Sequence, residues 1–230
     1  MLKSLKKTVC EANRRLPKLG LAPLDWGNVS GIDRTRGLMV IKPGEIAFEE
    51  LSPEDMTVVD MAGIVVEGYY KPSADMLTHL RLYQAFEEIE GIAHTHAAWG
   101  TAFAQAGHWI PAYGATHADF FHGAVPCTRE LSDGEVFGEY EQETGNAIVE
   151  AFCGIDPLAV PAALVYRHGA YAWGVSPADA VKNAYALEEV AKIAAYTRML
   201  SPELPQASQA LLDKHYLMKR GANNMENIEE

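Results

Sequence analysis

The sequence predicts a three-layer α/β/α fold built around a central, mostly antiparallel sheet. Short apolar runs rich in β-branched residues come in pairs around tight turns, which is typical of hairpins rather than of strand–helix–strand units. Longer segments with helical spacing of apolar residues lie between and after these pairs, so helices are expected on both faces of the sheet. The chain has 230 residues, 48% of them hydrophobic, and is therefore long enough to bury a sizeable core.

Turn residues place three hairpins. The first surrounds Arg34-Thr35-Arg36-Gly37, the second has Ala62-Gly63 at its tip, and the third turns at His168-Gly169. A further short strand is expected at 92–96. The three pairs of β-rich runs lie within residues 28–44, 56–68 and 162–173.

Helix ends are marked by capping residues. Pro17 and Gly20 end the first helix, Ser132 or Asp133 caps a later one, and Ser176-Pro177-Ala178-Asp179 is a capping box with proline at the first helical position. The predicted helices span residues 3–16, 76–88, 97–106, 134–152, 177–200 and 206–219, and strand and loop are expected over 111–129.

The sequence has no internal repeat and no linker. Residues 1–221 are therefore expected to form one domain, followed by a polar C-terminal tail over 222–230. The absence of a signal-peptide core, and of any run near the roughly 18 residues of a membrane helix, excludes a membrane protein. Three cysteines with no close spacing suit reduced thiols, so a cytoplasmic protein is expected.

The net charge limits the partners. Nineteen Lys and Arg against thirty-one Asp and Glu give a formal charge of −12. This acidity argues against a nucleic-acid or anionic-membrane binder, whose affinity depends on basic side chains. An anionic small substrate remains compatible with a local cluster of cations.

The strongest local signal is His94-Thr95-His96 at the end of an apolar strand. Side chains two apart on a strand point the same way, so both imidazoles can face one cation. Zinc requires at least one more ligand. His168, in an exposed turn at another strand end, is the candidate; the alternative is a chance pair of histidines, one of them capping a turn.

Two aspartates are candidates for chemistry. Asp75 lies at a predicted helix start, where an N-cap is the simpler interpretation. Asp119 lies among aromatic residues that would desolvate its carboxylate, which favours a proton-transfer role. A turn aspartate bonded to nearby backbone amides is the alternative for Asp119.

Two glycine-containing segments are candidates for anion binding. Gly27 and Gly44 would let backbone amides approach an anion, while Asn28 donates a hydrogen bond and Lys42 supplies positive charge. Plain turn chemistry explains the same residues equally well.

Taken together, these segments resemble the class II aldolase/adducin family, and within it most closely the epimerase branch. The resemblance extends to about Gly221. The matching segments are DWGNVS at 25–30, VIKP at 40–43, VVEG and KPS within 65–73, GIAHTHA at 91–97, IPAYGATHADFF at 110–121, PCTR at 126–129, GEYEQETGN at 138–146, RHGAYAWG at 167–174 and LLDKHYL at 211–217.

The resemblance implies a homotetramer with active sites between subunits. It also implies a divalent metal, zinc or alternatively manganese or cobalt, held by Asp75, His94, His96 and His168, with no nicotinamide cofactor. The implied reaction interconverts L-ribulose 5-phosphate and D-xylulose 5-phosphate by retro-aldol cleavage of the C3–C4 bond and re-formation with inversion at C4. Asp119 corresponds to one of the two acid/base groups. At position 75 the aldolase branch has a proton-transferring Glu, so Asp75 favours the epimerase.

Three departures from the family pattern bear on the substrate. Glu226 stands near the place of the tyrosine that is the second acid/base group, unless the tail has no role. Gly44-Glu45 replaces Ser-Gly, and Ser73-Ala74 replaces Ser-Ser, where the missing hydroxyls would bind the phosphate. The substrate-binding residues implied are Gly27, Asn28, Lys42, Gly44, Ser73 and Ala74. The alternative is an aldolase or epimerase acting on a different, differently phosphorylated or unphosphorylated, sugar.

Overall fold

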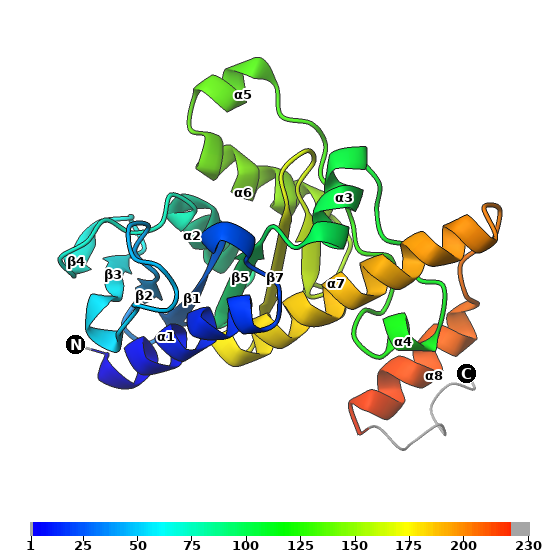
Figure 1. Cartoon of the computed structure of the whole chain (residues 1–230), viewed down its shortest axis with the longest axis horizontal. Helices are drawn as coiled ribbons and strands as arrows, with labels where there is room; N and C mark the ends of the chain where they lie inside the picture. The colour runs from blue at the N-terminus through cyan, green and yellow to red at the C-terminus, as the bar shows by residue number, and fades with distance from the viewer. Residues whose placement is uncertain (1, 222–230) are drawn as a thin grey trace.

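A seven-stranded antiparallel sheet forms the centre of the computed structural model, which describes residues 2–221 (Figure 1). The strand order is β4-β3-β2-β1-β5-β7-β6, and every pair of neighbouring strands is antiparallel. The prediction of a mostly antiparallel sheet is therefore confirmed. The strands are β1 (Gly27–Asp33), β2 (Leu38–Ile41), β3 (Thr57–Asp60), β4 (Val65–Glu67), β5 (Gly91–Thr95), β6 (Ala162–Leu164) and β7 (Ala170–Gly174).

The three predicted hairpins are present as β1–β2, β3–β4 and β6–β7. The single strand β5 lies between β1 and β7, so it joins the first hairpins to the last one. Its residues are all buried, as its apolar sequence predicts.

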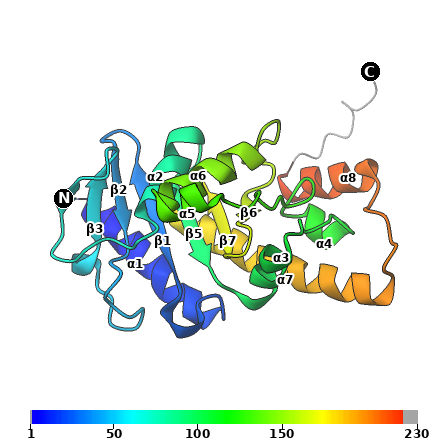
Figure 2. The same cartoon turned by 90° about the horizontal axis from the view of Figure 1, so that it is seen from above.

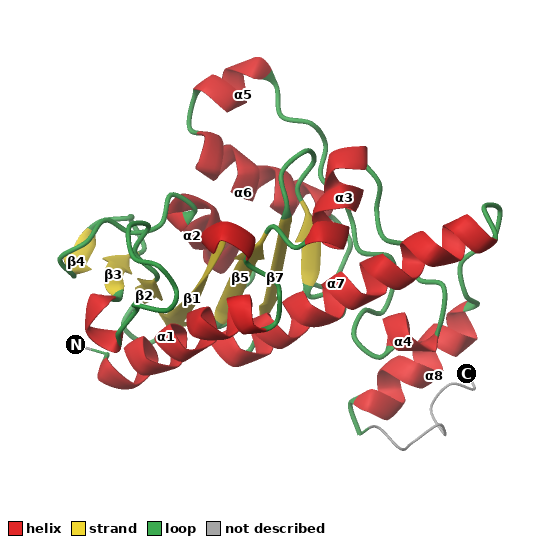
Figure 3. Cartoon of the chain, viewed as in Figure 1, coloured by secondary structure: helices red, strands yellow, loops and turns green. Residues whose placement is uncertain are grey.

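Helices cover both faces of the sheet (Figure 3). On one face, α1 (Lys3–Lys18) packs on β1 and β2, and α7 (Pro177–Leu200) packs on β5 and β7. The α3 helix (Ala98–Ala106) packs on α7. Within residues 2–221, no helix combines the length and the apolar character that crossing a membrane would require.

The opposite face is covered by α2 (Met76–Ala85) and α6 (Tyr140–Ala151), which pack on each other. Aromatic rings join this layer to the sheet. Phe86 and Phe152 lie with ring centroids 5.3 and 5.0 Å from that of the fully buried Trp173 on β7. Figure 2 shows the sheet between the two helical layers, with α8 (Gln209–Lys219) beside α4 (Ala115–Ala118) beyond it.

Two secondary-structure predictions were wrong in detail. The helix expected over 134–152 is split into α5 (Asp133–Phe137) and α6, because Gly138 has a non-helical ψ of −128°. Ser132 caps α5, as predicted. Residues 111–129, expected as strand and loop, include the short helix α4. Other boundaries shift by a few residues: α1 includes Pro17 in its last turn, and the final helix begins at Gln209.

Gly91 at the start of β5 lies directly against the segment that leads into α7. A Cβ at this position would clash with the backbone of Ser176 and Pro177. Gly91→Ala should therefore destabilise the protein by about 1–3 kcal/mol, the usual cost of overpacking a close contact. Gly114→Ala is the matched control, because nothing lies within 4 Å of a Cβ there. Urea unfolding gives the free energy of unfolding of each variant, and equal values for the two variants would contradict the close contact at Gly91.

Candidate metal centre and anion-binding loops

The predicted site residues gather at one edge of the sheet. Because neighbouring strands are antiparallel, the starts of β1 and β7 and the ends of β2 and β5 meet there. Asn28 lies at the start of β1, and His94 and His96 lie at the end of β5. His168 lies just before β7, in the turn from β6.

Three imidazoles converge at this edge. His94, His96 and His168 each offer a ring nitrogen, and these nitrogens all lie within 4.8 Å of one another. The Nε2 atoms of His94 and His96 are 3.0 Å apart. This spacing is close to that of two ligands on one zinc ion, whose Zn–N bonds are about 2.0–2.1 Å long.

Hydrogen bonds from the outer side orient two of the rings. The Nδ1 of His94 lies 3.0 Å from the carbonyl oxygen of Ala170, which can only accept, so Nδ1 carries the proton. The other ring nitrogen, Nε2, faces the other imidazoles. The hydroxyl of Tyr140 lies 3.1 Å from Nδ1 of His168. Such outer contacts are typical of metal-ligating histidines.

Burial keeps two of the imidazoles neutral. It lowers the pKa of His96 to about 4, and the neighbouring His94 contributes in the same direction. The pKa of His168 falls to about 4 for the same reasons. Neutral imidazole is the form that binds a metal, so the donor set fits a divalent cation.

Asp75 lies beside this cluster, at the N-cap position of α2. Its side chain makes no capping hydrogen bond, so the N-cap interpretation of the sequence does not apply. Its Oδ1 is 3.9 Å from Nε2 of His94. Asp75 is thus adjacent to the three-imidazole set without belonging to it.

Several side chains hold the Asp75 carboxylate. Tyr171 donates to Oδ1 at 3.0 Å, and Asn28 and Ser73 donate to Oδ2 at 2.6 and 3.3 Å. Burial alone would raise the pKa of this carboxyl. Electrostatic interaction with the His94 and His79 rings, together with the hydrogen bond from Tyr171, outweighs burial and holds the pKa of Asp75 well below its usual range.

One of the two predicted anion-binding segments, Lys42-Pro43-Gly44, lies beside residues 71–73, which lead into Asp75. Ser73 donates its backbone N–H to the carbonyl of Lys42, and Gly44 donates to that of Lys71. Lys42 is only 3% exposed; its Nζ donates to the carbonyl of Pro43 and lies 4.9 Å above the ring of Phe48. Burial lowers the pKa of the Lys42 ammonium.

The remaining loop residues differ in their roles. Gly27 has a φ of +112°, and a Cβ there would clash with the carbonyl of His94, so only glycine fits. Asn28 donates to Ser73 and Asp75, which uses both protons of its amide nitrogen, while its buried Oδ1 has no protein partner among the described residues. Both amide protons of Asn28 are thus bonded to neighbouring side chains, whereas the sequence predicts that Asn28 donates to an anion. Gly44 and Ala74 are exposed.

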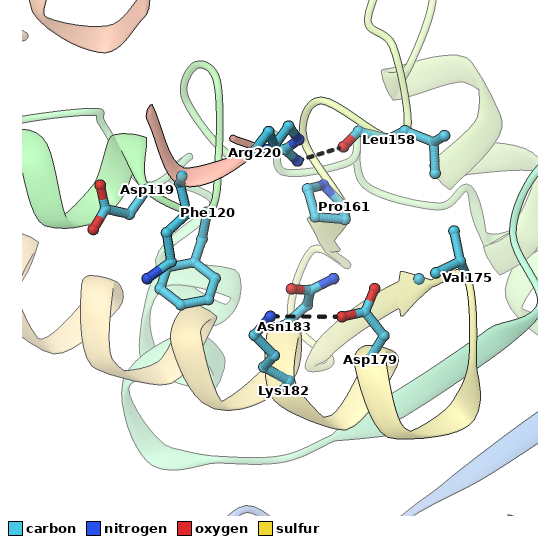
Figure 4. A pocket seen from close by; sticks show the side chains of 11 residues that line it. Asp119, Phe120, Leu158, Pro161, Val175, Asp179, Lys182, Asn183 and Arg220 are labelled. Atoms are coloured by element: carbon cyan, nitrogen blue, oxygen red, sulfur yellow. Dashed lines mark hydrogen bonds and ion pairs between the residues drawn. The ribbon is translucent and has the colours of Figure 1, made fainter. Parts of the chain in front are cut away.

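Asp119 lies at the opposite edge of the sheet. It lines a cavity of about 300 Å³ together with Gly174 and Val175, at the far end of β7 (Figure 4). The five residues of β7 separate the two edges by about 13 Å, at about 3.3 Å per residue. Within one chain the structure thus does not bring Asp119 to the imidazoles. Its carboxylate is 3.2 Å from Nδ1 of His215 on α8. Glu226 lies outside the described residues.

Sequence reasoning missed two tyrosines. Tyr171 was expected only as a strand residue, and Tyr140 as part of a helix. The available signal for Tyr171 is its place in a predicted strand, three residues after His168. Side chains alternate between the two faces of a strand, so Tyr171 has only two possible orientations, one of them toward the histidines. Nothing local to Tyr140 marks its contact with His168, which depends on how α6 packs.

The structure thus combines an antiparallel α/β/α scaffold with a cluster of three imidazoles that is a candidate metal site. A family model described as Class II Aldolase and Adducin N-terminal domain matches residues 7–195, and the chain belongs to this family.

Solved structures with the same fold agree. An L-fuculose 1-phosphate aldolase is 24% identical, with coverage of 94% of this chain and 96% of that one and a TM-score of 0.79. YgbL of Escherichia coli, described as a candidate aldolase/epimerase/decarboxylase, is 22% identical, with 93% and 98% coverage and a TM-score of 0.71. The L-fuculose-1-phosphate aldolase of Thermus thermophilus is 23% identical, with 89% and 100% coverage and a TM-score of 0.68.

The α4 segment that carries Asp119 depends on a neutral histidine. His117 is 5% exposed and donates from Nε2 to the carbonyl of Gly123 at 2.6 Å. Burial lowers its pKa from 6.5 to about 4. The unfolded chain therefore binds a proton below pH 6.5 that the folded chain refuses, and stability falls as the pH drops from about 6.5 to about 4.

We therefore expect His117→Gln to flatten the acid limb of the stability profile, by about 1 kcal/mol at pH 5.5 relative to pH 7.5. Urea unfolding at the two pH values measures this difference. The exposed His108 provides the control substitution, His108→Gln. If the free energy of unfolding of the His117 variant fell between pH 7.5 and pH 5.5 as much as that of the wild type, the His117 ring would not stay neutral in the folded protein.

Proposed function

We propose that this protein is a metal-dependent sugar-phosphate 4-epimerase that interconverts L-ribulose 5-phosphate and D-xylulose 5-phosphate. The observation that carries the proposal is the convergence of three imidazoles at one edge of the sheet, with the carboxylate of Asp75 beside them. Asp75, where the aldolase branch has Glu, favours the epimerase over the aldolase.

His94, His96 and His168 would hold the metal, with Asp75 as the fourth ligand. Zinc suits imidazole and carboxylate donors best, and manganese or cobalt accept the same ligands. When bound, the ion supplies Lewis-acid stabilisation of the negative charge that develops on the sugar oxygens during C3–C4 cleavage.

The segments that carry Gly27, Lys42 and Ser73 would hold the phosphate. Lys42 offers a positive charge with little surrounding water, which strengthens its attraction for an anion. Ser73 contributes a hydroxyl, while Gly27 and Gly44 allow close approach of the backbone. Asn28 and Ala74 complete the lining of this substrate site.

Proton transfer at the C4 hydroxyl would fall to Asp119 of a second copy, in a homotetramer with its sites between subunits. The distance between Asp119 and the imidazoles within one chain supports this arrangement. Glu226 is the proposed second acid/base group.

An aldolase, or an epimerase for another sugar, is the alternative. The L-fuculose aldolases among the structural neighbours favour it, as do the exposed Glu45 and Ala74 in the phosphate loops, where a carboxylate would repel a dianion. Comparing kcat/KM for L-ribulose 5-phosphate, its unphosphorylated form and L-fuculose 1-phosphate separates the two. A strong preference for the phosphorylated pentose would reject the alternative.

Metal analysis combined with NMR identification of products tests the central claim. The purified protein should contain about one divalent ion per chain and convert L-ribulose 5-phosphate to its C4 epimer. His96→Asn should lose the metal and nearly all turnover, because one of three imidazole ligands is gone. Trp109→Phe, a conservative change of an exposed ring outside the proposed ligand set, is the control. Full turnover in the metal-depleted wild type would refute the proposal.

Asp119→Asn should retain the metal and the fold but slow epimerisation by roughly 10²- to 10⁴-fold, the usual contribution of a general acid or base. Steady-state kinetics together with metal content distinguish this outcome from unfolding. Turnover close to that of the wild type would remove Asp119 from the mechanism.

A further inference from the structure

Three side chains form a row across the neighbouring strands β1, β5 and β7, close to the edge of the sheet where the imidazoles lie. In the strand register, Asn28 of β1 lies opposite His94 of β5, and His94 lies opposite Tyr171 of β7. Directly paired residues of antiparallel strands point to the same face, so all three side chains face the layer of α2 and α6. Asp75, at the start of α2, lies over this row.

The outer two members of the row hold the two carboxylate oxygens of Asp75. Asn28 donates to Oδ2 at 2.6 Å, and the hydroxyl of Tyr171 donates to Oδ1 at 3.0 Å. The carboxylate therefore spans His94, and it is Oδ1, the oxygen bonded to Tyr171, that lies 3.9 Å from Nε2 of His94.

Tyr171 also contacts His94 directly. The two rings are stacked, with centroids 4.2 Å apart and planes inclined by 18°. The phenol ring is completely buried, and His79 packs against its edge at 5.8 Å. Its position is thereby fixed on both sides, so it can restrict the orientation of the groups that it touches.

We propose that Tyr171 is a positioning residue of the metal centre: its ring fixes His94, and its hydroxyl aims Oδ1 of Asp75 at the site where the metal binds. The inference rests on the proposed function, because it requires a metal at the histidines. A carboxylate oxygen has two lone pairs, so Oδ1 can accept from Tyr171 and ligate an ion at the same time.

The test is the affinity for zinc, measured by competition with a chromogenic chelator, together with the visible spectrum of the cobalt-substituted protein. Tyr171→Phe keeps the stacked ring and removes only the hydroxyl. Loss of an outer hydrogen bond to a ligand typically weakens metal binding by about 10- to 100-fold, and we expect a loss in this range with a changed cobalt absorption band. Tyr83→Phe is the matched control, since the buried Tyr83 hydroxyl bonds Ser30 and none of the proposed ligands.

A double-mutant cycle separates positioning from general stability. In an Asp75→Ala background the Tyr171→Phe change should no longer alter zinc affinity, because its effect passes through Asp75. The comparison of Asp75→Ala with the double variant also serves if Tyr171→Phe alone fails to fold, since removing Asp75 removes the carboxylate oxygen that has lost its Tyr171 donor.

The possible failures are distinguishable. Zinc affinity unchanged by Tyr171→Phe, or weakened equally with and without Asp75, would overturn the positioning role while leaving the metal centre intact. A wild-type protein that binds no zinc or cobalt would instead overturn the proposed function itself.

Discussion

The partly buried negative charge of Asp75 is the constraint on which the rest of the site depends. Removing a carboxylate from water costs several kcal/mol unless hydrogen bonds and opposite charges compensate. The chain compensates with Asn28, Ser73 and Tyr171, which come from β1, the loop before α2, and β7. Each of these elements must therefore occupy its observed place if the carboxylate is to remain charged.

The antiparallel sheet brings these elements together around the Asp75 carboxylate. Because neighbouring strands run in opposite directions, residues far apart in the chain arrive at the same edge, and pairing in register aligns their side chains. The same geometry brings the backbone of His94 against Gly27, where any side chain would clash. The position of the imidazoles and the backbone of the anion-binding loop are thus set by the same pair of strands.

Sequence predicted much of the site because its signals are local. The period of two along β5 places His94 and His96 together, and a turn before a strand places His168. What failed depended on tertiary packing. Gly138 is compatible with a helix interior at a cost of about 1 kcal/mol, so the break between α5 and α6 was not visible. The direction of the Asn28 amide follows from its contact with Asp75, and the role of Tyr171 follows from the register between β5 and β7.

Asp119 and the imidazoles lie at opposite ends of β7, so in the proposed assembly each chain would contribute to two different sites. In that assembly, a substitution in one subunit inactivates a site to which a neighbouring subunit also contributes. Two inactive variants, one lacking an imidazole and the other lacking the Asp119 carboxylate, would then complement each other when assembled into mixed tetramers. Intact centres would form wherever the sound half of one meets the sound half of the other.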